Sequence, residues 1–161
     1  MRQEFLDKIS EHQKIIHKVS SVYCSDPEAR KDLFQEILIQ LWRAYPSFKG
    51  EAKFSTWMYR VALNTAITYF KKDKRSIPTQ SIENEVFQVR DESRDEEFEA
   101  RVEFLHRAIA TLSSIEKSIV LLYLEEKKYD EISEIMGITQ NNVRVKMSRI
   151  KDKLRKIMNP S

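Results

Sequence analysis

Residues 129–156 read YDEISEIMGITQNNVRVKMSRIKDKLRK, and they predict two helices joined by a tight turn. From Tyr129 to Met136 the apolar side chains recur at helical spacing, with acidic side chains on the other side. Gly137 supplies the left-handed backbone conformation that ends a helix at low cost. Thr139 is a favourable N-cap, so we expect the second helix to start at the next residue.

The second helix of this stretch has two contrasting faces. Its apolar residues alternate at spacings of four and three and form one narrow stripe: Val143, Met147, Ile150, Leu154 and Ile157. Its opposite face carries amide and basic side chains together with Val145. Exposing this apolar side chain to water does not stabilise a soluble helix. A thymine methyl group suits this valine, and amides and guanidinium groups suit base edges. The layout is therefore that of a DNA-binding helix-turn-helix.

An ordinary helical hairpin with a solvated basic face is the alternative, because charge runs usually mean only solubility. Against it stand the glycine at the turn, the basic tail, and amide side chains at Gln140, Asn141 and Asn142. Together these features favour DNA binding.

The composition favours an all-helical protein without a catalytic or metal centre. Only 2 of 161 residues are glycine, 33% are charged and 41% are hydrophobic. Cys24 is the single cysteine, and the 3 histidines are scattered, so we expect no metal, no cofactor and no enzymatic activity. No apolar run is long enough to span a membrane, and the first residues lack a signal-peptide core. We therefore expect a cytoplasmic protein.

The charge is divided into three blocks along the chain. Residues 1–75 carry 14 Lys and Arg against 9 Asp and Glu, residues 76–105 carry 3 against 9, and residues 106–161 carry 11 against 7. Two basic blocks around an acidic one suggest two nucleic-acid-facing domains and a linker. The predicted flexible linker covers residues 76–97, which lack sustained periodicity and are rich in Ser, Asp, Glu and Gln.

Periodicity and capping signals predict further helices before residue 129. They are expected over 2–22, from Pro27 to about Tyr45, over 54–72, over 98–112, and from the capping box at Ser113 to about Glu126. The predicted inward residues include Trp42 in the second helix, a stripe from Phe54 to Tyr69 in the third that leaves out Tyr59, Arg60 and Asn64, and Ile115, Ile119, Leu122 and Tyr123 in the last.

Aromatic residues and a basic run come together in residues 54–75. Single-strand binders combine aromatic rings, on which bases stack, with cations for the backbone. Core packing is the alternative role of these rings, and composition alone does not decide between the two.

Three segments resemble conserved regions of bacterial extracytoplasmic-function (ECF) sigma factors, which belong to the sigma-70 superfamily. Residues 48–66, FKGEAKFSTWMYRVALNTA, resemble the second conserved region, and Asp32–Ile37 resembles its DLxQExF segment. Residues 129–138 resemble the YxEIAxxLGI segment of the fourth region, with Ser133 in place of the usual alanine. Residues 140–142 are less usual for the family, which leaves the promoter sequence open.

The resemblance implies an all-α protein of two small helical domains. A region 2 domain would span residues 1–75 and a region 4 helix-turn-helix domain residues 98–161, joined by the acidic linker, which would run toward the RNA exit channel of the polymerase. Such a protein binds bacterial core RNA polymerase, at the β′ clamp and the β flap, and directs it to specific promoters. Promoter DNA is the second implied partner, and an anti-sigma factor is the third.

The implied site residues fall on the matching positions of this chain. The residues for the −35 duplex element are Thr139, Gln140, Asn141, Asn142, Arg144, Val145, Lys146 and Arg149. The residues for the single-stranded −10 element are Phe48, Lys49, Gly50, Lys53, Tyr59, Arg60, Asn64 and Lys71. The residues that would bind the polymerase are Asp32, Gln35 and Glu36.

Two other functions remain as alternatives at this point. A stand-alone helix-turn-helix regulator, whose N-terminal domain dimerises or senses a ligand, predicts tight binding to a palindromic duplex without polymerase. A protein-interaction module predicts only weak and nonspecific DNA binding.

Overall fold

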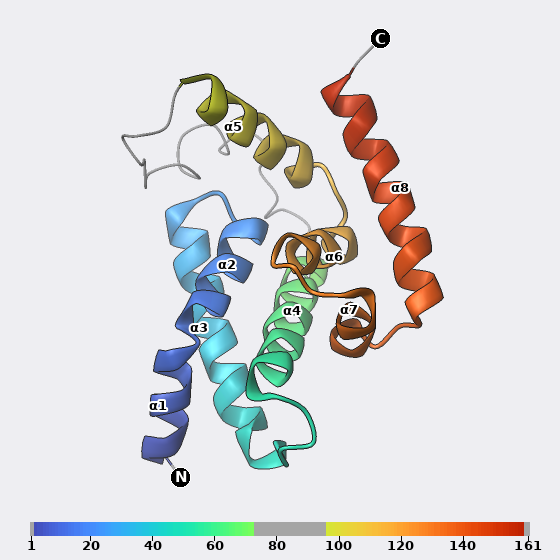
Figure 1. The fold of residues 1–161 in the computed structure, drawn as a ribbon. Helices are drawn as coiled ribbons and strands as arrows, with labels where there is room; N and C mark the ends of the chain where they lie inside the picture. The colour runs from blue at the N-terminus through green and yellow to red at the C-terminus, as the bar shows by residue number, and fades with distance from the viewer. Residues whose placement is uncertain (1, 73–95, 160–161) are drawn as a thin grey trace.

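The computed structural model describes residues 2–72 and 96–159, and every regular element in these two ranges is a helix (Figure 1). The elements are α1 (Arg2–Glu11), α2 (Gln13–Tyr23), α3 (Pro27–Ala44), a 3-10 turn (Tyr45–Ser47), α4 (Phe54–Lys72), α5 (Glu96–Ala110), α6 (Ser114–Leu124), α7 (Tyr129–Met136) and α8 (Gln140–Met158). The predicted all-α class is thereby confirmed. The predicted linker lies largely in residues 73–95, outside the described ranges.

The first group of helices packs α2, α3 and α4 around an apolar core. Ile16, Leu33 and Met58 are fully buried there, one from each helix. The start of α3 follows from local sequence: the Ala29 amide donates to the Asp26 carboxylate at 3.0 Å, and Pro27 fits the first turn.

The helix predicted over residues 2–22 is divided at His12, so that prediction was wrong. His12 leaves helical geometry, with φ −118° and ψ 17°, and its ring lies 5.4 Å from the ring of Phe54. Phe5 of α1 and Ile15 of α2, on the two sides of this break, are both buried. Helical periodicity alone does not reveal a bend that packing imposes.

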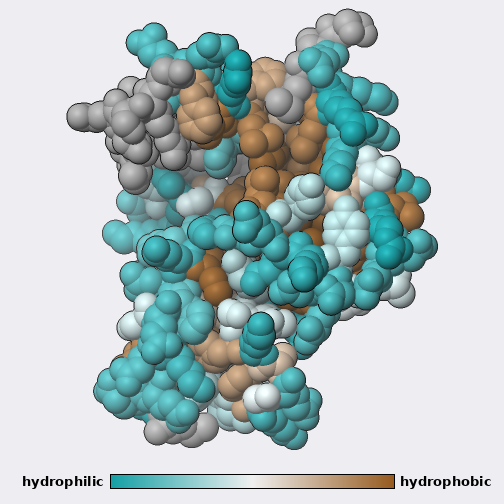
Figure 2. Space-filling model, in the orientation of Figure 1, coloured by the Kyte–Doolittle hydropathy of each residue, from teal (hydrophilic) through white to brown (hydrophobic). Residues whose placement is uncertain are grey.

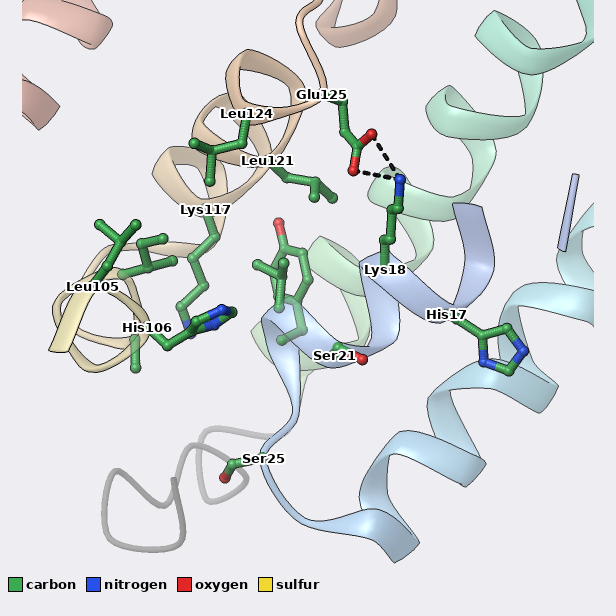
Figure 3. A pocket seen from close by; sticks show the side chains of 14 residues that line it. His17, Lys18, Ser21, Ser25, Leu105, His106, Lys117, Leu121, Leu124 and Glu125 are labelled. Atoms are coloured by element: carbon green, nitrogen blue, oxygen red, sulfur yellow. Dashed lines mark hydrogen bonds and ion pairs between the residues drawn. The ribbon is translucent and has the colours of Figure 1, made fainter. Parts of the chain in front are cut away.

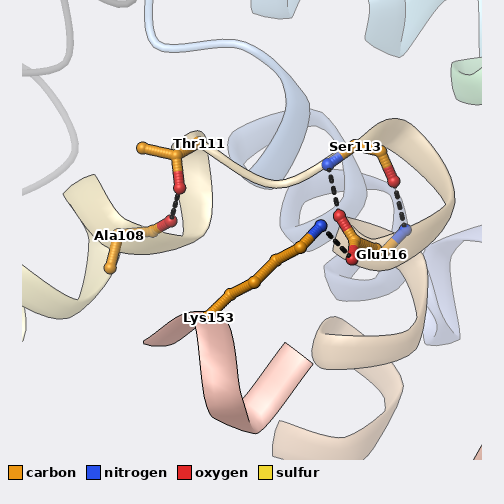
Figure 4. Close-up of polar contacts among 5 residues, drawn as sticks. All are labelled: Ala108, Thr111, Ser113, Glu116 and Lys153. Atoms are coloured by element: carbon orange, nitrogen blue, oxygen red, sulfur yellow. Dashed lines mark hydrogen bonds and ion pairs between the residues drawn. The ribbon is translucent and has the colours of Figure 1, made fainter. Parts of the chain in front are cut away.

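Helices α5, α6, α7 and α8 form the second group, and local sequence signals set the start of α6 and the end of α7. At the start of α6, the Glu116 amide donates to the Ser113 hydroxyl and the Ser113 amide donates to the Glu116 carboxylate, at 3.2 and 3.0 Å (Figure 4). Lys153 of α8 adds an ion pair to the same carboxylate at 2.8 Å. Gly137 ends α7 at φ 70°, in the left-handed region as predicted.

Three side chains predicted to face inward are in fact exposed. Trp42 is 47% exposed, Ile115 44% and Tyr123 40%. The middle of α6, residues 117–122, is instead buried on every side, because the helix lies against α2 and α4 on one side and α8 on the other. The stripe predicted for α4 was incomplete. Trp57 and Met58 of the stripe are buried as predicted, but Tyr59 and Leu63 outside it are buried too, so other helices cover more of α4 than one apolar face.

Candidate nucleic-acid interface

The start of α8 presents an exposed polar face. Thr139 caps the helix by accepting a hydrogen bond from the Asn142 amide at 3.0 Å, so the predicted N-cap is confirmed. The exposed residues of this face are Gln140, Asn141, Asn142, Arg144, Val145 and Arg149, and we call them the duplex-reading face. Lys146 beside them is half-buried. Val145 is 39% exposed, which leaves its methyl groups open to a partner.

The opposite side of α8 fixes the orientation of this face. Val143, Met147 and Ile150 are buried against the rest of the second group, to which α8 packs through α5, α6 and α7. Ile132 of α7 is fully buried in the same core. The stripe predicted from spacing is thus the inner side of α8, and its amide and basic side chains point away from the protein.

The loop of residues 48–53 is anchored by an aromatic cluster. The ring of Phe48 lies 5.5 Å from that of Phe54 and 5.2 Å from that of Trp57, and the Lys8 ammonium lies 5.4 Å from the Phe48 ring centroid. The tip beyond this anchor is exposed at Lys49, Gly50 and Lys53. Gly50 has φ 76°, a conformation that glycine adopts without strain.

The predicted −10 residues of α4 differ in exposure. Asn64 is exposed, but Tyr59 is only 4% exposed and has the Lys127 ammonium 5.5 Å from its ring centroid. Arg60 donates to the main-chain carbonyl of Glu134 at 2.7 Å. We call residues 48–53 together with Tyr59, Arg60 and Asn64 the strand-binding face. The second helical group covers part of it.

Burial also affects the chemistry of this face. It raises the pKa of Tyr59 to about 12, with a smaller contribution from the negative charge of Glu125. The hydroxyl of Tyr59 therefore stays protonated even at alkaline pH values at which an exposed tyrosine begins to ionise. Lys71 lies in the last turn of α4, and its side chain is outside the described part of the chain.

The predicted polymerase-binding residues share one side of α3. Asp32 and Gln35 are exposed, while Glu36 is half-buried and accepts a hydrogen bond from the Gln40 amide at 3.0 Å. Ile39 and Trp42 continue the exposed side and are 44% and 47% exposed. The sequence interpretation assigned Trp42 to the core and did not single out Ile39. Ile39 follows Gln35 by four residues and Trp42 follows Ile39 by three, and this spacing is the signal that could have found them.

Residues 2–72 and 96–159 contain neither a metal site nor a membrane-spanning helix. No group of three or more His, Cys, Asp or Glu side chains there could hold a metal ion. The same residues contain no helix with the length and apolar character that a membrane crossing requires.

Comparisons with known proteins identify the two helical groups. Residues 9–76 match the Sigma-70 region 2 family and residues 105–154 the Sigma-70, region 4 family. The chain is 31% identical over 150 residues to the ECF RNA polymerase sigma-E factor of Escherichia coli K12, covering 84% of this chain and 78% of that protein. It is 28% identical over 138 residues to the RNA polymerase sigma factor YlaC of Bacillus subtilis, covering 83% and 80%.

A solved structure shares the fold. The sigma factor RpoE of Bartonella quintana, crystallised with the anti-sigma factor NepR, superposes with a TM-score of 0.73 over 97% of each chain, at 15% identity. The helix-turn-helix formed by α7 and α8 thus lies in the region 4 domain of a transcription initiation factor. This chain belongs to the ECF family of sigma-70 RNA polymerase sigma factors.

Proposed function

We propose that this protein binds bacterial core RNA polymerase and directs it to specific promoters, with α8 reading the −35 element as duplex and α4 holding the −10 element as a single strand. The observation that carries the proposal is the duplex-reading face, in which amide and basic side chains are exposed over a buried apolar stripe. The region 2 domain would span residues 1–75 and the region 4 domain residues 98–161.

Each part of the duplex-reading face suits a distinct group in the major groove. The amides of Gln140 and Asn141 can pair with a donor and an acceptor on one base edge, and the guanidinium of Arg144 suits guanine. Val145 suits a thymine methyl group, while Arg149, further from the helix start, suits a phosphate. A single base-edge contact of this kind contributes about 1–3 kcal/mol of discrimination.

The strand-binding face suits unpaired DNA. The exposed tip at Lys49, Gly50 and Lys53 would hold one flipped base, and Tyr59, Arg60 and Asn64 would line the path of the strand. Separating DNA costs about 1.4 kcal/mol per base-pair step, and stacking on an aromatic ring returns about 1–3 kcal/mol per base. The two amounts nearly cancel, so stable melting requires the additional contacts of the polymerase.

Docking on the polymerase would use the exposed side of α3. Asp32, Gln35 and Glu36 would contact the β′ clamp, with Ile39 and Trp42 adding apolar surface beside them. Hydrophobic side chains also gather between α5 and α8 (Figure 2), and we propose this area as the contact with the β flap. The function requires the protein to act in the cytoplasm, where the polymerase and the chromosome are.

An anti-sigma factor is the third proposed partner. The RpoE structure contains the anti-sigma factor NepR, and a second similar structure is that of CnrH with the cytosolic domain of CnrY. NepR is the partner of RpoE in that structure, and CnrY is the partner of CnrH. We propose that a partner of the same kind regulates this chain.

Run-off transcription tests the function. Core RNA polymerase is incubated with fragmented genomic DNA of the source bacterium, with and without the protein, and new transcripts are mapped. Defined start sites that depend on the protein are expected, and the Asp32→Lys, Glu36→Lys double variant should lose them through loss of polymerase binding. No new start site, together with tight binding of the protein alone to a palindromic duplex, would favour a stand-alone regulator.

A further inference from the structure

A cavity of about 350 Å³ lies between α2, α5 and α6 (Figure 3). Protein interiors leave few voids larger than a water molecule, whereas ligand pockets have volumes of about 300–1,000 Å³ and a mostly apolar lining. The apolar side chains that line this cavity come from all three helices: Val22, Leu105, Ile109, Leu121 and Leu124. Lys18 and Ser21 of α2 line it too and are exposed, so a small molecule can enter from that side.

The lining also contains a buried cation. Lys117 of α6 is only 4% exposed, and its side chain extends toward His106 of α5, which lines the same cavity (Figure 3). Burial lowers the pKa of Lys117, because apolar surroundings disfavour the charged form. Lysine is almost never fully buried without a negative partner. A buried ammonium at this position therefore requires a compensating group.

The described part of the chain does not supply that group. No hydrogen bond or ion pair from a described residue reaches the Lys117 ammonium, which lies 5.8 Å from the ring centroid of Tyr23. Burial raises the pKa of Cys24 to about 12, so this nearby thiol carries no negative charge at neutral pH. Lys18, the other lysine of the lining, differs, because it forms an ion pair with Glu125 at 2.7 Å.

We infer that the cavity binds a small aliphatic monocarboxylate, whose carboxylate pairs with Lys117 and whose chain lies against the leucines of α5 and α6. The carboxylate supplies the negative charge that the ammonium lacks, in a charge-assisted hydrogen bond. Burial lowers the pKa of His106, so its ring is neutral at pH 7 and adds no second positive charge. A phosphate monoester carries close to two negative charges and would leave one of them uncompensated. The lining therefore selects a monoanion.

This site is separate from the two proposed DNA-binding faces. None of the residues of the duplex-reading face or of the strand-binding face lines the cavity. A bound carboxylate would instead contact α2 in one domain and α5 and α6 in the other. The inference goes beyond promoter recognition, and its test needs neither DNA nor polymerase.

Calorimetric titration of the full-length protein with sodium octanoate tests the site. Octanol is the neutral ligand of the same chain length, and sodium acetate is the carboxylate without the chain. Octanoate should bind at least about tenfold more tightly than octanol, because only the carboxylate pairs with the ammonium. Acetate should bind at least about tenfold more weakly than octanoate, because it buries no methylene groups. Equal affinity for octanoate and octanol would overturn the inference.

Three variants assign the two parts of the ligand. Lys117→Met keeps an unbranched apolar side chain and removes the charge, so octanoate affinity should fall to that of octanol. Unchanged octanol affinity in this variant would show that the cavity persists. Ser21→Trp obstructs the exposed side and should weaken both ligands. Lys14→Met, which removes an exposed charge of α2 outside the cavity, is the matched control and should change neither. Undiminished octanoate binding by Lys117→Met would contradict the inference.

NMR of methyl-labelled leucines locates the ligand in the unaltered protein, so this measurement does not depend on how a variant folds. Octanoate should shift the methyl signals of the three cavity leucines, Leu105, Leu121 and Leu124. The signal of Leu33, which is fully buried in the core of α2, α3 and α4, should not move. Shifts that leave out the cavity leucines would place octanoate elsewhere and overturn the inference.

Discussion

The two proposed DNA-binding faces differ in what covers them. The duplex-reading face at the start of α8 is open, with Asn141, Arg144 and Val145 exposed. The strand-binding face is open at its loop and at Asn64, while Tyr59 is buried and Arg60 is half-buried and hydrogen-bonded to α7. Both faces use polar side chains over an apolar core, so their chemistry alone does not explain the contrast.

The contrast matches the state of the DNA that each face would bind. A −35 duplex exists before the polymerase arrives, so a permanently exposed face can read it. A −10 single strand exists only after melting, and melting requires the polymerase. The predictions below test the two sides of this contrast, from the largest expected effect to the smallest.

The largest effect should come from the core beneath the duplex-reading face. Ile150 lies on the inner side of α8 and is fully buried, so Ile150→Ala should lower the free energy of unfolding by about 2–5 kcal/mol and weaken −35 duplex binding through loss of order in α8. Urea denaturation measures the first effect and fluorescence anisotropy the second. Val145→Ala on the exposed side should change stability by less than about 0.5 kcal/mol. Equal stability of the two variants would contradict the orientation of α8, in which Ile150 faces the core and Val145 faces solvent.

The second-largest effects should come from removing single side chains of the duplex-reading face. Asn141→Ala and Arg144→Ala should each weaken holoenzyme binding to the −35 element by about 1–3 kcal/mol and relax sequence preference at one position. Binding of the −10 strand should not change. Arg155→Ala, an exposed arginine further along α8, is the control for loss of charge. Unchanged sequence preference in both variants would show that α8 is not the reading helix.

The two left-handed glycines allow a matched comparison of the faces. Gly137 has φ 70° and Gly50 has φ 76°, and an added Cβ meets no atom within 4 Å at either position. Substitution by alanine should therefore cost only backbone strain, about 1–2 kcal/mol at each site. Gly137→Ala should lower the stability of region 4 and weaken duplex binding, whereas Gly50→Ala should weaken only strand binding. The same loss of duplex binding in both variants would remove the distinction between the faces.

The smallest effect concerns acid stability at the start of α6. Burial raises the pKa of Glu116, but the hydrogen bonds and charge of Lys153 and the hydrogen bonds of Ser113 outweigh it, so the net pKa lies below its ordinary value. A lowered carboxyl pKa stabilises the fold above the ordinary value, and that stabilisation is lost as the pH falls through the lowered one. Urea midpoints measured from pH 6 downward should therefore fall more steeply for the wild type than for Glu116→Gln. Parallel curves would contradict this.

Local signals in the sequence predicted the local structure well. The cap at Asp26, the capping box at Ser113, the turn at Gly137 and the inner stripe of α8 each depend on residues within a few positions of each other. For the same reason the duplex-reading face, which lies opposite that stripe, could be predicted to be exposed.

The errors arose where one part of the chain meets a distant part. The burial of Tyr59 and Lys117 depends on contact between residues far apart in sequence, and the sequence analysis singled out neither as a core residue. Trp42 was assigned to the core because it is large and apolar, but it lies on the exposed side of α3. Periodicity indicates which side of a helix is apolar, not which sides a second domain covers.

Probing one mapped promoter for duplex protection and for melting, with and without polymerase, tests the central claim most directly. DNase I reports protection of duplex DNA, and permanganate reports unpaired thymines. The account predicts that the holoenzyme protects the −35 region and exposes reactive thymines at −10, that Arg144→Ala reduces the protection, and that the protein alone melts nothing. Protection of a palindrome by the protein alone, with no polymerase-dependent melting, would contradict the account.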